Sequence, residues 1–180
     1  MPSRTKSGFT LVEVAVVAAI TGIITTFMLL NFQRSRIDLT LTTNELVGGL
    51  RSAQTRALAS ERHDTGTGLK IRCGYGIHYI DQTSYALYVG PDAASVSCSA
   101  LNKNYDSADT IILTSTFIDT RVEFKASFND IFFEPPDPKT YLNNDSTLGL
   151  PPQAITLGKI GGTCPNDCKT INVYTSGKIE

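Results

Sequence analysis

Residues 8–30 have the sequence GFTLVEVAVVAAITGIITTFMLL, in which Glu13 is the one charged side chain of a long apolar run. From Phe9 to Leu30 the run is 22 residues long, and as an α-helix it would extend about 33 Å, against about 30 Å for the hydrocarbon core of a bilayer. The segment is therefore predicted to be a helix that can span a membrane. It is longer than the apolar part of a secretory signal peptide and continues into a polar amphipathic stretch, so we expect it to remain in the mature protein.

Glu13 is the unusual residue of this segment, because an ionisable side chain at the centre of a membrane helix costs roughly 2.5–3.5 kcal/mol on insertion scales. One interpretation is a chance charge that stays hydrated near the headgroups, since Glu13 lies only about 6 Å along the helix from Phe9. The other is that the carboxylate awaits a positively charged partner, such as an amine created by cleavage before Phe9. The residues alone leave both interpretations open.

Gly8 followed by Phe9-Thr10-Leu11-Val12-Glu13, after a short leader that contains Arg4 and Lys6, resembles the processing site of type IV prepilins and type II secretion pseudopilins. The resemblance implies that a prepilin peptidase cuts between Gly8 and Phe9 and methylates the new N-terminus on Phe9. It also implies that Glu13 helps the subunit to dock into a helical filament. By the same resemblance, the leader lies in the cytoplasm.

The overall charge gives no sign of a nucleic-acid-binding protein. Lys and Arg number 16 against 17 Asp and Glu, and removal of Arg4 and Lys6 with the leader leaves 14 against 17. Arg34 and Arg36 follow the apolar run as Arg4 and Lys6 precede it, so the positive-inside rule does not orient the span.

Beyond the apolar run, small and aliphatic residues recur at helical spacing and form a narrow stripe: Leu39, Leu46, Leu50, Ala53 and Ala57. The pattern predicts that the helix continues to about Ser60, with its other faces in water. Gly22 and the pair Gly48-Gly49 are candidate bends, because glycine weakens a helix.

From Leu69 onward the helical pattern gives way to short β-branched or alternating runs separated by turn residues. Strands are predicted near 69–73, 75–80, 84–89, 110–118, 120–126, 130–134, 154–158 and 170–174. Hairpin turns are expected at residues 81–84 and at Asp119-Thr120, and the proline-rich stretch from Glu134 to Pro152 is expected to be a long exposed loop. The predicted fold class is α+β: a long N-terminal helix packed against an antiparallel β-sheet or β-sandwich, as in pilins.

The order of these elements resembles the GspH/FimT-type minor pseudopilins and minor pilins. This looser resemblance depends on the long helix, on the segment 50–57 near its end, on the strands that follow, and on the closing sequence INVYTSGKI at residues 171–179.

Four cysteines lie in the part expected outside the membrane, where an even number indicates two disulfides: Cys73, Cys98, Cys164 and Cys168. Three pairings are possible, and loop entropy does not choose among them. Locality favours Cys164 with Cys168 across a hairpin turn, which leaves Cys73 with Cys98. A zinc site is the alternative, but the cysteines lack the paired short spacings of a zinc ribbon, so no metal site and no cofactor are predicted.

Other motifs favour solvated or structural roles. Ser60, His63 and Asp64 are triad residue types without a nucleophile elbow, so no enzyme is predicted. Calcium binding by Asp137 with residues 143–145 lacks a ligand period. A DNA-binding patch is interrupted by acidic residues and is a minority hypothesis; its members would be Arg51, Arg56, Arg62, Lys70 and Arg72.

These observations predict a leader over residues 1–8, a membrane and filament-core helix over 9–30, the soluble half of the helix over 31–62, and a β-rich head over 63–180. The expected protein is a minor pilin or pseudopilin in the bacterial inner membrane, with its head outside the cytoplasm, that later enters a periplasmic or cell-surface filament. Its expected partners are the prepilin peptidase, the lipid bilayer, the inner-membrane assembly platform and other pilins. Two alternatives are a DNA-binding minor pilin for DNA uptake and an anchored envelope domain that does not polymerise.

Overall fold

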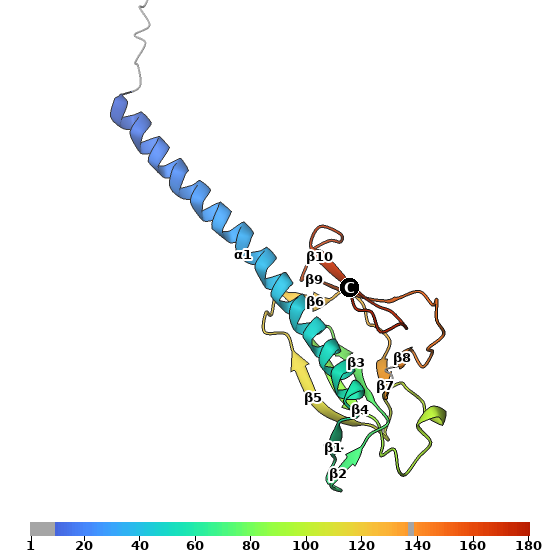
Figure 1. Cartoon of the computed structure of the whole chain (residues 1–180). Coiled ribbons are helices and arrows are strands. Elements are labelled where there is room, and N and C mark those ends of the chain that lie inside the picture. Colours follow the sequence, from blue (N-terminus) through green and yellow to red (C-terminus); the bar gives the residue numbers. More distant parts are fainter. Residues whose placement is uncertain (1–9, 137–138) are drawn as a thin grey trace, which may run out of the picture. The chain divides into compact units, whose positions relative to one another are not determined.

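The structure, a computed structural model, describes residues 10–136 and 139–180, and it leaves the side chains of residues 30–38 outside the description. It contains one α-helix, α1, over Leu11–Leu58 (Figure 1). The chain divides into two compact units, Met1–Ile37 and Asp38–Glu180, and each is considered by itself. The helix was predicted to reach about Ser60; it ends at Leu58, just before Ser60 takes a positive φ of 46° that a helix cannot contain.

Ten strands and one short 3-10 helix follow α1 in the second unit. In chain order they are β1 (Arg62–Asp64), β2 (Leu69–Ile71), β3 (Tyr75–Asp81), β4 (Ser84–Val89), η1 (Cys98–Ala100), β5 (Thr110–Thr116), β6 (Val122–Phe124), β7 (Ile131–Glu134), β8 (Lys139–Leu142), β9 (Gln153–Lys159) and β10 (Cys168–Val173).

The strands form three antiparallel sheets. The largest has the order β5-β4-β3-β7-β8, the second has the order β10-β9-β6, and β1 pairs with β2 in a separate hairpin. The predicted turn at residues 81–84 is present, because Asp81 pairs with Ser84 and its carboxylate accepts a hydrogen bond from the Thr83 N–H at 2.7 Å. The architecture confirms the predicted α+β, pilin-like fold class.

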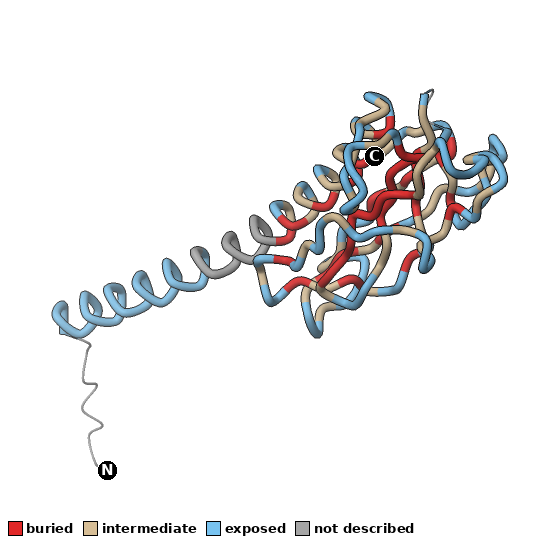
Figure 2. Tube along the Cα trace, turned by 90° about the horizontal axis from the view of Figure 1, so that it is seen from below, coloured by how far each residue is buried: buried red, intermediate tan, exposed pale blue. Residues whose placement is uncertain are grey.

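The core lies between α1 and the sheets. The predicted stripe of α1 is buried, with exposed fractions of 6% at Leu39 and 0% at Leu46, Leu50, Ala53 and Ala57. It packs in one cluster with apolar side chains of both larger sheets, so a single core joins the helix to both (Figures 1 and 2). Burial of a large aliphatic side chain contributes about 1.5–3 kcal/mol, so this stripe fixes which face of the helix meets the sheets.

At Gly49, α1 lies close to Tyr85 of β4 in the large sheet. A Cβ on Gly49 would lie 2.7 Å from the Tyr85 hydroxyl oxygen, whereas a Cβ on Gly48 would meet nothing within 4 Å. The helix runs unbroken through both glycines, so neither is the bend that the sequence suggested. Gly49 is instead a packing residue that leaves room for the Tyr85 ring.

The prediction of one long loop from Glu134 to Pro152 is wrong. Strand β8 lies within it and pairs with β7, with Glu134 opposite Lys139 and Ile131 opposite Leu142. Two of its four residues, Thr140 and Leu142, are buried. The nearby prolines concealed a short strand that is stabilised by pairing with the preceding strand β7 and has no clear pattern of its own.

The prediction of a hairpin at Asp119-Thr120 is also wrong. A turn is present, because the Val122 N–H donates to the Asp119 carbonyl at 3.1 Å. However, β5 belongs to the large sheet and β6 pairs with β9 in the other sheet, so the turn carries the chain from one sheet to the next. Residues close together in the sequence determine the turn. The sheet that each flanking strand joins depends instead on which of its side chains are buried in the core.

Both cysteine pairs named from the sequence are present as disulfides, Cys73–Cys98 and Cys164–Cys168. The first attaches η1 to the start of β3. The second closes the turn between β9 and β10, where Cys168 pairs with Gly158. The first disulfide therefore links the loop between β4 and β5 to the large sheet, and the second links the loop between β9 and β10 to the start of β10.

Adjacent glycines of α1 offer a matched pair of substitutions. We expect Gly48→Ala to stabilise the protein by about 0.5–1 kcal/mol, because alanine favours helix and nothing opposes its Cβ. Gly49→Ala should instead destabilise it by about 1–3 kcal/mol, because the new Cβ meets the buried Tyr85 ring. Urea unfolding of both variants in detergent measures the difference. Equal effects at the two positions would contradict the close approach of α1 to β4.

The disulfides predict a definite result in peptide mapping. Without reduction, digestion of protein exported by its native host should release one peptide pair that joins Cys73 to Cys98 and one that joins Cys164 to Cys168. Reduction should lower the unfolding free energy by about 2–4 kcal/mol for the longer loop. Free thiols in the exported protein would show that the compartment or the pairing is different.

Candidate functional site

The N-terminus of α1 is stabilised by Thr10, the first residue that the structure describes. The Thr10 hydroxyl oxygen accepts a hydrogen bond from the Glu13 N–H at 3.3 Å, and the Thr10 carbonyl accepts from the same N–H at 3.1 Å. Thr10 is thus the N-cap, and Glu13 lies at the third helical position, in the Thr-x-x-Glu spacing of a capping box. A carboxylate in the first turn also complements the positive end of the helix dipole.

Glu13 lies among exposed apolar side chains. Leu11, Val12 and Val14 have exposed fractions of 87%, 70% and 59%, and every described residue of the span Leu11–Leu29 is exposed within this unit (Figure 2). By length and composition, this span can cross a membrane. Among the residues that the structure describes, no Lys, Arg or His forms an ion pair with Glu13.

The other polar side chains of the span are satisfied within the helix. The Thr21 hydroxyl donates to the Val17 carbonyl at 2.9 Å, and the Thr26 hydroxyl donates to the Gly22 carbonyl at 2.8 Å. Hydroxyls bonded in this way can enter hydrocarbon at little cost, because none needs a partner from water. Glu13 is therefore the one side chain between residues 10 and 29 that brings a charge into the apolar segment.

Gly8 and Phe9, the residues predicted to flank the cleavage site, lie outside the described residues. The structure shows that the helix begins at Leu11, so the predicted scissile bond precedes the first helical turn.

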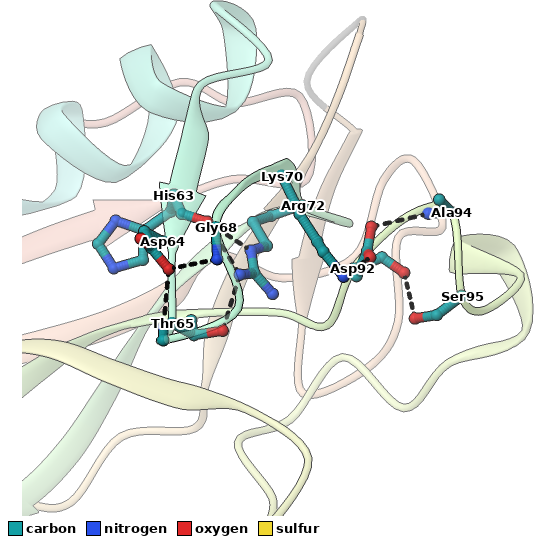
Figure 3. Close-up of polar contacts among 10 residues, drawn as sticks. His63, Asp64, Thr65, Gly68, Lys70, Arg72, Asp92, Ala94 and Ser95 are labelled. Carbon is teal, nitrogen blue, oxygen red and sulfur yellow. Dashed lines mark hydrogen bonds and ion pairs between the residues drawn. The ribbon is translucent and has the colours of Figure 1, made fainter.

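Three of the five basic residues of the hypothetical DNA patch have partners within the protein, and Figure 3 shows two of them, Lys70 and Arg72. Arg72 is 5% exposed and donates through Nε and Nη2 to the His63 carbonyl, at 3.0 and 2.9 Å. Lys70 forms an ion pair with Asp92 at 2.9 Å, and Arg56 forms one with Glu61 at 3.0 Å. These contacts occupy three of the five proposed cations, and two of the three partners are carboxylates that offset their charge.

Of the triad residue types near the end of α1, Asp64 is engaged in a turn. The Asp64 carboxylate accepts hydrogen bonds from the Gly66 and Gly68 N–H groups at 2.7 and 2.9 Å, and these bonds lower the pKa of Asp64. The carboxylate thus closes the β1–β2 turn (Figure 3).

In the proposed calcium loop, the side-chain oxygens of Asn144 and Asp145 accept hydrogen bonds from backbone N–H groups. Asn144 Oδ1 accepts from the Lys103 N–H at 2.8 Å, and Asp145 Oδ1 accepts from the Thr147 N–H at 2.8 Å. Asp137 lies outside the described residues. Among the residues that are described, no group of three or more His, Cys, Asp or Glu side chains is placed to hold a metal ion.

Sequence reasoning missed a buried lysine, Lys103, which is 2% exposed. Its ammonium lies 3.4 Å from Glu134 Oε2 and 5.5 and 5.1 Å from the ring centroids of Phe132 and Tyr141, and it donates to the Cys98 carbonyl. Burial, followed by the hydrogen bond to Glu134, raises the pKa of Tyr141 to about 12, so its hydroxyl remains a donor to that carboxylate at 2.6 Å.

The contacts of Lys103 serve to hold a loop rather than a substrate. The Tyr88 hydroxyl donates to the Lys103 carbonyl at 2.8 Å, so the residue is bonded to the sheet through its backbone as well as through its side chain. Together with the disulfide Cys73–Cys98, it fixes the segment between β4 and β5 over the outer face of the sheet. A lone lysine between loop residues has no sequence signal, because its partners are far apart in the chain.

Comparison with protein families finds one match. The family model described as the prokaryotic N-terminal methylation motif matches residues 3–29, which include Gly8, Phe9, Glu13 and the span Leu11–Leu29. Comparison of the chain with curated proteins and with solved structures gives no match. The matched motif supports a type IV pilin-like protein that is a substrate of prepilin peptidase, and the apolar helix is consistent with membrane anchoring.

Proposed function

We propose that the protein is a minor pilin or pseudopilin of the GspH/FimT type, a structural subunit of a type IV pilus or of a type II secretion pseudopilus. It is made as a membrane-anchored precursor, cut between Gly8 and Phe9, methylated on Phe9 and assembled through α1. The observation that carries the proposal is the lone carboxylate of Glu13 in an apolar helix whose N-terminus matches the methylation motif.

The proposal explains why a single charge is kept in the span. Near the headgroups the carboxylate of Glu13 stays hydrated, but a filament core excludes water and leaves an unpaired carboxylate strongly disfavoured. Cleavage before Phe9 creates an amine, which stays cationic after a single methylation. The amine of a neighbouring subunit can then pair with Glu13, and this pairing is available only after processing.

The head fits the compartment that the proposal requires. Its two disulfides are typical of an oxidising environment outside the cytoplasm. The larger compact unit, Asp38–Glu180, contains the head together with the C-terminal part of α1, and its core buries the apolar stripe from Leu39 to Ala57. A head of this kind can fold while the apolar helix is still in the bilayer, so export and assembly are separate steps.

Processing gives the first test of the proposal. The intact mass of protein from host membranes should correspond to loss of residues 1–8 and gain of one methyl group on Phe9. Gly8→Ala should block both changes, because the cleavage site no longer has its glycine. A full-length, unmodified N-terminus in the wild-type protein would contradict the proposal at its first step.

Assembly gives the second test. Glu13→Val and Glu13→Gln should leave membrane insertion and head folding intact and lower incorporation into filaments by about ten-fold or more, because the partner amine would remain unpaired. Incorporation is measured by immunoblotting sheared filaments.

Thr10→Ala is the matched control for this second test, since it removes the N-cap of α1 but keeps the carboxylate. It should assemble nearly as well as wild type, with at most the cost of a lost cap, about 1 kcal/mol. An equal loss in Thr10→Ala and Glu13→Gln would assign Glu13 to helix capping. Full recovery of the Glu13 variants in filaments would show that Glu13 is a tolerated interfacial charge without an assembly role.

A further inference from the structure

The two edges of the five-stranded sheet are built differently. At one edge, β8 has four residues, begins with Lys139, and its last residue, Leu142, is already bridged to Asp145. At the other edge, β5 is seven residues long, with the sequence TIILTST, and contains no charge and no proline. Natural proteins protect exposed edges with charges, prolines or covering segments, so a long uncharged edge is an exception that requires a reason.

The backbone of β5 offers unused hydrogen-bonding groups at this edge. The Phe117 N–H donates to the Thr83 carbonyl at 2.9 Å, which continues the ladder between β5 and β4. Because antiparallel pairs alternate between bonded and non-bonded positions, the N–H and C=O groups of Thr114 and Thr116 face away from β4. Both residues are exposed. A bulge at Ile112, between the pairs Leu113–Leu87 and Ile111–Tyr88, shifts the alternation before Leu113, so the outward orientation is assigned only to Thr114 and Thr116.

Apolar side chains surround the same edge. Leu113 is 58% exposed, Ile111 is 40% exposed, and Ile118, just after the strand, is 90% exposed. A groove of about 510 Å³ lies beside Ile118, and its lining is mixed: Leu41, Thr42 and Glu45 of α1, and the ion pair of Asp119 with Arg121. An added strand would therefore gain backbone hydrogen bonds and would also cover apolar surface that the head leaves in water.

We propose that β5 is a docking edge that accepts an extended, uncharged strand from a different subunit by β-strand addition. The proposal rests on the proposed function, because a subunit of a filament has neighbours that can supply such a strand. The occupant is defined by the edge itself. Outward N–H and C=O groups select an extended backbone, and the uncharged side chains of β5 with the exposed Leu113 select apolar and hydroxyl side chains.

A second copy of this chain does not fit the edge. Two identical edge strands related by a closed two-fold axis pair antiparallel, with the axis normal to the sheet. The helices that lie on the sheets, residues 39–58, would then run in opposite directions, whereas subunits that leave one membrane for one filament share a direction.

The remaining strand edges of the two larger sheets cannot receive β5 of another copy either. Leu142 of β8 is bridged to Asp145, Asn172 of β10 exchanges two hydrogen bonds with Glu180, and the Phe124 N–H of β6 donates to the Gln82 carbonyl. Strands β1 and β2 of the separate hairpin have three residues each, too few to match the seven residues of β5. Among the residues that the structure describes, β5 therefore has no matching open edge on its own chain. This leaves a strand of a different subunit as the occupant.

The test uses the full-length protein in its native host. Thr114→Pro removes an outward N–H and leaves the bonds from β5 to β4 in place, since proline is tolerated where an edge N–H faces solvent. Thr114→Val is the matched control, because it changes the same side chain and keeps the N–H. We expect Thr114→Pro to lower recovery in sheared filaments about ten-fold and Thr114→Val to leave it unchanged. Thr116→Pro, at the next outward position, should act like Thr114→Pro.

Two readouts separate docking from folding and from the proposed function. N-terminal processing and the unfolding temperature in detergent should be the same in wild type and in at least one proline variant. Absence of processed wild type from filaments would overturn the proposed function itself. Normal recovery of both proline variants in filaments would overturn the docking edge alone.

Hydrogen exchange locates the contact directly. The amides of Thr114 and Thr116 should exchange about 100-fold more slowly in sheared filaments than in the detergent-solubilised subunit. Equal exchange in the two states would contradict strand addition at β5. Efficient oxidative cross-linking of Thr114→Cys into a homodimer in filaments would show that a second copy, and not a different subunit, occupies the edge.

Discussion

Leu46, Leu50 and Ala53 of α1 have no exposed surface, because they press against the inner faces of the two larger sheets. The rest of the head depends on this contact. The two sheets are separate hydrogen-bonded units, and the helix supplies apolar surface against which both are buried. Gly49 sets how closely the helix can approach, since any larger residue would meet Tyr85. The outer face of the large sheet is covered separately, by the loop that Lys103 and the Cys73–Cys98 disulfide hold in place.

The same helix is under a different constraint at its other end. Between Leu11 and Leu29 its side chains are exposed and apolar, its threonine hydroxyls bond to its own carbonyls, and Glu13 alone carries charge. One helix is thus suited to an apolar surrounding at its start and to a protein core at its end. A filament supplies both, because the apolar part can exchange lipid for neighbouring helices while the head keeps its own core.

Glu13 and β5 represent two kinds of unfinished interaction. In the described part of the chain, Glu13 is a charge without an ion-pair partner. Strand β5 is uncharged and pairs with β4 on one side, but no described strand pairs with it on the other. An isolated subunit tolerates both because water or headgroups solvate them. Their cost rises when water is removed, so each would favour association with a partner that completes it. The charge can act deep in a filament and the edge at its surface, which would let the two contacts act independently.

Features that depend on residues close together in the chain could be predicted from the sequence. The apolar run with Glu13, the buried stripe of α1, the turn at Asp81 and the α+β class follow from length, helical period and turn chemistry, and these act over a few residues. Pairing decided the rest. Strand β8 forms because β7 lies beside it, β6 joins a different sheet from β5, and Lys103 is buried because Glu134 and two aromatic rings surround it. The outer edge of β5 likewise stays open because no other described strand pairs with it, and only the tertiary structure determines which strands pair.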